Sequence, residues 1–274
     1  MARDAARSLP PLRPGNLLPA RTMAVAWSVM ALIALLCWLV IVAQSGDMGV
    51  SAGTMGMALP LFLLLWAVMM AAMMFPSVAP VAVTWARSIG RQASGWGRAA
   101  RVAQFACGYL VAWTLFGLIA YGVLALTGDA VDAHPAVGRW IGAAAFLIAG
   151  LQQLGPLKDV CLRHCRSPLA QLVRYAAFRP VARDLRVGIH HGLYCVGCCW
   201  GLMLVLVPLG AMNIAAMAAV SVVIFVEKLW SRGPVLANVV GVLFVVLAVV
   251  TALGLFRDAL VPGLSPSGEQ MDMG

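Results

Sequence analysis

Charged residues are scarce in this chain. Asp, Glu, Lys and Arg together make up 11% of its 274 residues, whereas hydrophobic residues make up 62%. Soluble globular domains carry about 25% charged residues, so the shortage excludes an ordinary water-soluble fold. We predict an all-α integral membrane protein, because helices satisfy their own backbone hydrogen bonds inside lipid.

Polar stretches are also short, and they separate seven apolar runs. The runs are 23–43, 58–75, 102–126, 137–154, 189–208, 211–226 and 234–256. Most of them approach the ~20 residues that a helix needs to cross a bilayer. We therefore expect a polytopic transmembrane bundle of about seven helices over 23–256, with an inner interfacial loop at 156–188. Residues 1–22 would form a basic cytoplasmic segment, and 257–274 an outer tail.

Acidic residues are the scarcer of the two charge types, with 10 against 19 basic residues and a net charge of +9. If the N-terminus is cytoplasmic, 17 of the basic residues fall in cytoplasmic segments, and only Arg139 and Arg257 fall outside. Such a bias follows the positive-inside rule. The basic charge therefore predicts a multi-pass protein of the cell membrane, with its C-terminus outside and lipid rather than nucleic acid as its partner.

Signatures of energy coupling are missing too. The chain has no Gly-rich phosphate-binding loop ending in Lys-Ser/Thr. No carboxylate lies well inside an apolar run, where coupled transporters usually carry one. Glu227 stands at the inner end of the run 211–226, and we expect it to form an interfacial ion pair. Active pumping is not predicted, and no catalytic residue is assigned.

Five of the seven cysteines, in contrast, are concentrated in two short segments. In a helix, His191, Cys195 and Cys199 are spaced i, i+4, i+8, and Cys198 follows Cys195 by three, so all four share one face. His191 and Cys199 would lie about 12 Å apart along the axis, too far for one ion. We expect one ion to take a neighbouring pair from this helix and its other ligands from elsewhere.

A second cysteine segment ends the fourth apolar run. Cys161 and Cys165 are four residues apart, with His164 beside them, so one helical turn can present both thiols. In the predicted topology every cysteine except Cys37 lies in the cytoplasmic half, where thiols stay reduced. The two segments therefore predict metal binding rather than structural disulfides.

Methionines bear on which metal binds. Met69, Met70, Met73 and Met74 form two i, i+4 pairs in the second run. Methionine stripes also serve as adaptable packing, so both roles stay open. Thiolates combined with thioethers favour Cu(I), whereas cysteine and histidine alone suit Zn(II). The methionines favour Cu(I), with Zn(II) as the alternative ion.

Further motif residues accompany these clusters between about residues 66 and 228. They are Trp66 to Pro80 with the methionine pairs, Pro156-Leu-Lys158, Arg166-Ser-Pro168, His191-Gly, Gly197-Cys198-Cys199-Trp200, Met203, Met212-Asn213 and Glu227-Lys228. In these motifs the chain resembles a bacterial family of predicted metal-binding integral membrane proteins, a domain family of unknown function. The resemblance implies a metal site in a bacterial inner-membrane protein.

Three functions remain open at this point. The leading hypothesis is Cu(I) binding near the cytoplasmic face for copper acquisition, transfer or homeostasis, with a metallochaperone or another membrane subunit as partner. The second is a membrane thiol-redox protein that uses the Cys195/Cys198 and Cys161/Cys165 pairs. The third is a scaffold or assembly subunit of a membrane complex, with a structural Zn(II) or no ion.

Overall fold

The computed structural model describes residues 20–48, 53–54, 56–89, 95–167, 174–175, 182–255 and 260–264. Helices dominate this part of the chain, and no strand occurs in it, which confirms the all-α class. Residues 1–19 of the predicted basic segment, the outer tail from 265 and most of the inner loop after 167 lie outside the described residues.

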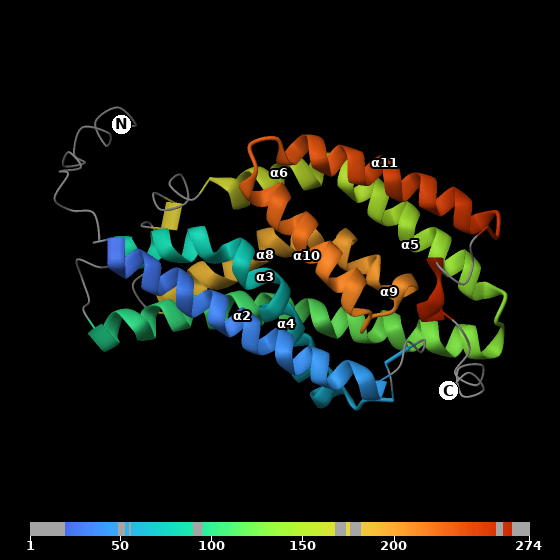
Figure 1. Cartoon of the computed structure of the whole chain (residues 1–274), viewed down its shortest axis with the longest axis horizontal. Coiled ribbons are helices and arrows are strands. Elements are labelled where there is room, and N and C mark those ends of the chain that lie inside the picture. Colours follow the sequence, from blue (N-terminus) through green and yellow to red (C-terminus); the bar gives the residue numbers. More distant parts are fainter. Residues whose placement is uncertain are drawn as a thin grey trace.

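The helices form one elongated bundle (Figure 1). They are α2 (Ala20–Met48), α3 (Leu59–Ile89), α4 (Gly95–Ala133), α5 (Val137–Leu154), α6 (Pro156–Arg166), α8 (Arg183–Leu204), α9 (Leu206–Leu209), α10 (Ile214–Leu229) and α11 (Gly233–Ala252), with a 3-10 turn at Pro262–Leu264. Each of the seven apolar runs coincides with one or two of these helices. The helices differ in how many side chains they expose. Helices α2 and α11 expose many Leu and Val side chains, whereas α3 and α8 are mostly buried.

Five of the helices are long and apolar enough to cross a membrane. They are α2, α3, α4, α8 and α11. The pair α5 and α6, bent by 60° at Gly155, would make a sixth span if it is counted as one. Helix α10 has 16 residues and is shorter than a typical span. The chain is thus compatible with a multi-pass membrane protein, while the count of seven spans and the placement of the termini stay predictions.

Close backbone contact fixes α8 against α4. A Cβ atom on Gly188 would overlap the carbonyl oxygen of Phe105, and one on Gly108 would overlap the carbonyl oxygen of Leu185. Small residues let membrane helices approach in this way. Two glycines, one on each helix, therefore hold the cysteine-bearing helix at a defined position in the bundle.

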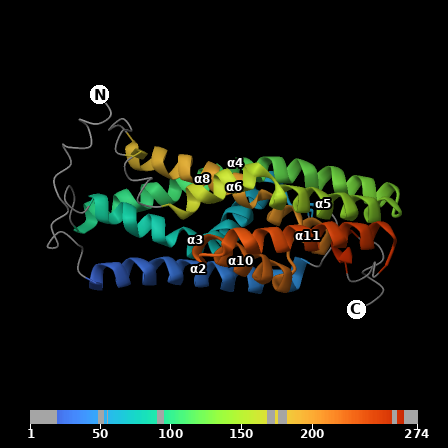
Figure 2. The same cartoon turned by 90° about the horizontal axis from the view of Figure 1, so that it is seen from above.

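Helix α6 reaches α8 because the chain turns sharply after α5. Pro156 begins α6, a position where the missing proline N–H is not needed. Figure 2 shows α6 beside α8. The contact is tight at Gly197, where an added Cβ would lie 2.7 Å from the Cys161 sulfur. The bend thus brings the second cysteine segment onto the first.

Candidate metal centre

One turn of α8 gathers three thiols. The sulfur atoms of Cys195, Cys198 and Cys199 all lie within 4.8 Å of one another, and all three side chains are buried. No other group of three His, Cys, Asp or Glu side chains in the described part of the chain meets this spacing. The i, i+3, i+4 pattern of the helix produces the cluster directly. The helix therefore supplies three candidate ligands, one more than the expected pair.

Helix α6 adds a fourth buried thiol. The sulfur of Cys165 lies 3.8 Å from that of Cys198, and Cys198 lies 3.2 Å from Cys199. We call Cys165, Cys195, Cys198 and Cys199 the thiol cluster. Cys161 is also buried and lies one turn earlier in α6, against Gly197. The two cysteine segments therefore meet, and the cluster combines thiols from two helices.

The predicted histidine ligands occupy a separate group. The His164 ring stacks on Tyr194, with ring centroids 3.7 Å apart. The Nδ1 atom of His191 lies 3.5 Å from the Tyr175 hydroxyl, which lies equally far from Nε2 of His164. Burial raises the pKa of Tyr175, so the phenol stays protonated and can act as a donor. His190, which the sequence reasoning did not select, joins this group beside His164.

Two polar groups contact the sulfur of Cys195. The Nζ atom of Lys228 lies 3.0 Å from it, and the Tyr109 hydroxyl lies 2.9 Å from it. Lys228 also contacts the Ser77 hydroxyl at 3.2 Å, which brings α3 to the same point. Positive charge thus stands inside the bundle beside a group of thiols. Metal binding would turn those thiols into thiolates, and the ammonium group would offset part of their charge.

A buried ion pair contacts the backbone of the cluster at Cys198. Lys158 contacts Glu227 at 2.6 Å and donates to the carbonyl oxygen of Cys198 at 2.8 Å. Gln153 donates to the second carboxylate oxygen of Glu227 at 2.7 Å. Both ions are almost completely inaccessible, with side-chain exposures of 0% and 1%. The network ties α5, α6 and α10 to the cysteine turn of α8.

The expectation for Glu227 was therefore right about the ion pair and wrong about its location. It does form an ion pair, but inside the bundle and with Lys158, not at the interface. Its position at the end of an apolar run made it look interfacial. Helix α6, which the bend folds back against α8 and α10, covers it and supplies its partner. Sequence reasoning also missed Tyr109 and Lys228 as neighbours of the cluster; the adjacent Glu227-Lys228 pair in the family motif was the available signal.

The four predicted methionine ligands, all on α3, lie in the core of the bundle. Met69, Met70, Met73 and Met74 are all buried. Ser77, one turn after Met73, is the α3 residue whose contact with Lys228 connects this helix to the cluster. A direct role of these thioethers as ligands stays a prediction. Of the remaining cysteines, Cys107 is exposed and Cys37 is partly buried in α2.

The comparison with known protein families agrees with the site. A family model described as "PpoB2: Copper chaperone" matches residues 63–251. The match includes α3, α6, α8 and α10, and therefore every side chain described around the thiol cluster. It also spans the whole region in which the sequence resembles metal-binding membrane proteins. Neither the curated proteins nor the solved structures contain a match to the chain.

Proposed function

The chain belongs to the copper chaperone family PpoB2, and from this premise we propose that it binds Cu(I) in the thiol cluster, within the bacterial inner membrane, and hands the ion on. Binding would take place in the half of the bundle that the positive-inside rule assigns to the cytoplasm. The chain would then act as a membrane-embedded copper carrier rather than as an enzyme.

The observation that carries the proposal is the convergence of three buried sulfur atoms within 4.8 Å. Thiolates are the protein ligands that Cu(I) prefers, and they bind it only after losing their protons. Four thiols would also suit a tetrahedral Zn(II) site. The family favours copper over zinc, since its description names copper as the cargo.

Release of the ion would use the histidine group. His191 precedes Cys195 by one turn of α8, and its neighbours His164 and Tyr175 belong to or follow α6. These side chains stand between the thiol cluster and the predicted cytoplasmic end of α8. Neutral imidazoles bind copper but carry no charge to hold it as thiolates do. We propose that this end receives a soluble metallochaperone or another membrane subunit.

The test is elemental analysis of protein purified anaerobically in mild detergent. The wild type should hold about one copper per chain. The triple variant C195S/C198S/C199S should lose it, whereas C37S, which carries the same change outside the cluster, should keep it. Zinc in place of copper would indicate a structural zinc site. A wild type without metal would contradict the proposal.

A thiol-redox function is the second candidate, and one distance favours keeping it. The sulfurs of Cys165 and Cys198 lie 3.8 Å apart on different helices. A redox protein must populate a disulfide during its cycle. Differential alkylation of thiols in intact cells distinguishes the two functions: a copper carrier keeps all four cluster thiols reduced, whereas a redox protein shows a fraction of them oxidised.

A further inference from the structure

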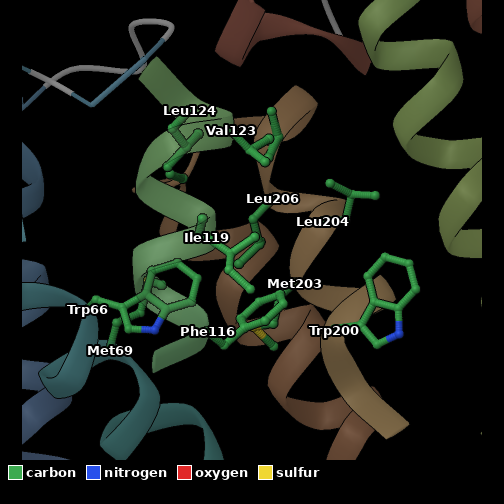
Figure 3. A pocket seen from close by; sticks show the side chains of 13 residues that line it. Trp66, Met69, Phe116, Ile119, Val123, Leu124, Trp200, Met203, Leu204 and Leu206 are labelled. Atoms are coloured by element: carbon green, nitrogen blue, oxygen red, sulfur yellow. The ribbon is translucent and has the colours of Figure 1, made fainter. Parts of the chain in front are cut away.

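Two adjoining cavities lie next to the cysteine turn of α8. The larger has a volume of about 210 Å³ and is lined by Ala211 and by side chains of α3, α4, α8 and α9. Figure 3 shows Trp66 and Trp200 on opposite sides of it. The smaller, of about 20 Å³, lies toward the start of α3. The two share Trp66, Met69, Leu124 and Ala211 as lining residues, so they adjoin across these side chains.

Among the described residues, methionines supply the only sulfur atoms that line the two cavities. Met57 and Met212 line the smaller cavity, Met203 lines the larger, and Met69 lines both. Every other lining side chain is aliphatic or aromatic. The indole N–H of Trp66 is already used, since it donates to the carbonyl oxygen of Trp113 at 2.9 Å. A cation inside these cavities would therefore find the thioether sulfurs as its ligands.

The methionines are ordered from one end of the bundle to the thiol cluster. Met57 is partly exposed and lies two residues before the start of α3. At the other end, Met203 follows Cys199 by four residues on α8, and both are buried. They therefore share a helix face and lie about 6 Å apart along the axis.

Helix α3 runs toward the same cluster. Met69, Met73 and Ser77 follow one another at intervals of four residues, and all three are buried. Ser77 contacts Lys228, and Lys228 contacts Cys195. Two helices thus lead from the cavities to the thiols, each with a methionine at the cavity end.

We propose that the two cavities form an access route for Cu(I), in which Met57, Met212, Met69 and Met203 bind the ion in turn before the thiol cluster receives it. This inference rests on the proposed copper function and adds a second set of ligands and a direction to it. Cu(I) would enter at the Met57 end, which the predicted topology places on the outer face.

Ligand exchange accounts for each step without a change of oxidation state. A thioether is a neutral, soft ligand, and a thiolate is a soft ligand with a negative charge, which binds Cu(I) more strongly. At the last step the bond from copper to the Met203 sulfur breaks and bonds to cysteine sulfurs form. Each thiol that becomes a ligand releases one proton to the aqueous phase. The direction follows from the rising charge of the ligands.

A lipid acyl chain is the competing occupant of an apolar cavity in a membrane protein. Such a chain would need the shape of the lining but not its sulfur atoms. Methionine and leucine have similar volumes and polarity, and exchanging them in a core usually costs little. Met→Leu variants therefore keep the cavity suitable for lipid and remove its capacity for copper.

The first experiment measures how fast copper reaches the thiols. Reduced protein in detergent is mixed with Cu(I), and the near-ultraviolet absorption of Cu(I)–thiolate bonds is followed in a stopped-flow instrument. M69L and M203L should lower the rate constant about tenfold and leave the final absorbance unchanged. M30L, a matched change at a buried methionine of α2 outside both cavities, should behave as wild type. Equal rates in all variants would overturn the route.

A second experiment asks whether the methionines bind copper on their own. All seven cysteines are replaced by Ser, and X-ray absorption is recorded after Cu(I) is added. Sulfur-coordinated copper should remain, should vanish when M69L and M203L are added, and should persist with M30L. Absence of sulfur-bound copper would overturn the route; if this variant does not fold, the rate measurement decides. No thiolate absorption in the wild type would instead contradict the proposed function.

Discussion

The ammonium nitrogen of Lys228 lies 3.0 Å from the sulfur of Cys195, deep in the bundle and within 3.2 Å of the Ser77 hydroxyl. An unpaired buried cation would be costly, so this lysine needs negative charge nearby when it is ionised. Thiolates that bind copper would provide it. The contact therefore makes Lys228 the side chain that would offset part of the negative charge of a filled cluster.

Removing that charge should weaken copper binding. We expect K228M to lower the Cu(I) affinity of the cluster about tenfold or more, as loss of a supporting contact does in other metal sites, because the bound thiolates would lose their nearest cation. Competition with a colorimetric Cu(I) chelator measures the affinity. S77A, which removes only the hydroxyl partner of Lys228, should have a much smaller effect. Equal affinities for wild type and K228M would contradict the assigned role.

The buried pair of Lys158 and Glu227 should govern stability. E227Q leaves the ammonium group of Lys158 buried without a counter-charge, and breaking such a pair costs about 3–5 kcal/mol. A lowered midpoint of thermal unfolding in detergent would report this loss. The double variant K158M/E227L removes both charges together and should recover most of the stability. If the single and double variants were equally destabilised, the ion pair would not be the cause.

The contact between α4 and α8 should tolerate no added methyl group at Gly188. G188A would force the carbonyl oxygen of Phe105 away, which separates the two helices and displaces the cysteine turn. We expect a lower unfolding temperature and less bound copper per chain. G122A is the matched control, since a Cβ at Gly122 meets nothing within 4 Å. Similar behaviour of the two alanine variants would show that the close contact is not needed.

Copper affinity should fall as pH falls. Protons compete with Cu(I) for each thiolate, and every thiol that becomes a ligand loses one proton on binding. The slope of log affinity against pH therefore gives the number of thiols that bind. Chelator competition at several pH values measures it, and C165S should give a smaller slope if Cys165 is a ligand. An affinity that does not change with pH would exclude binding through thiolates.

Sequence periodicity predicted the helices and the cysteine turn well, because both depend on local geometry. Apolar runs become helices in lipid whatever surrounds them, and residues at i, i+3 and i+4 meet on one helix face. Helical spacing alone was enough to predict that Cys195, Cys198 and Cys199 lie together. His191 lies outside the trio because it precedes Cys199 by eight residues, about 12 Å along the helix axis. Its ring packs beside Tyr109 and Tyr175.

The buried ion pair of Lys158 and Glu227 could not be predicted from patterns within single helices. Lys158 and Glu227 stand at the ends of apolar runs, where charged residues usually meet water or headgroups. Their burial depends on the 60° bend between α5 and α6, which folds Lys158 against α8 and α10. Residues 69 positions apart become partners through this bend, and no pattern within one helix indicates such a pairing.

The trio of cysteines in α8 has a consequence for how this site can change over generations. Substitutions in distant helices leave its spacing intact, because a single turn of backbone defines it. A one-residue insertion or deletion between Cys195 and Cys199 would rotate one part of the trio by about 100° relative to the other. The composition of the exposed side of the segment can therefore change, but its length between these two cysteines is fixed.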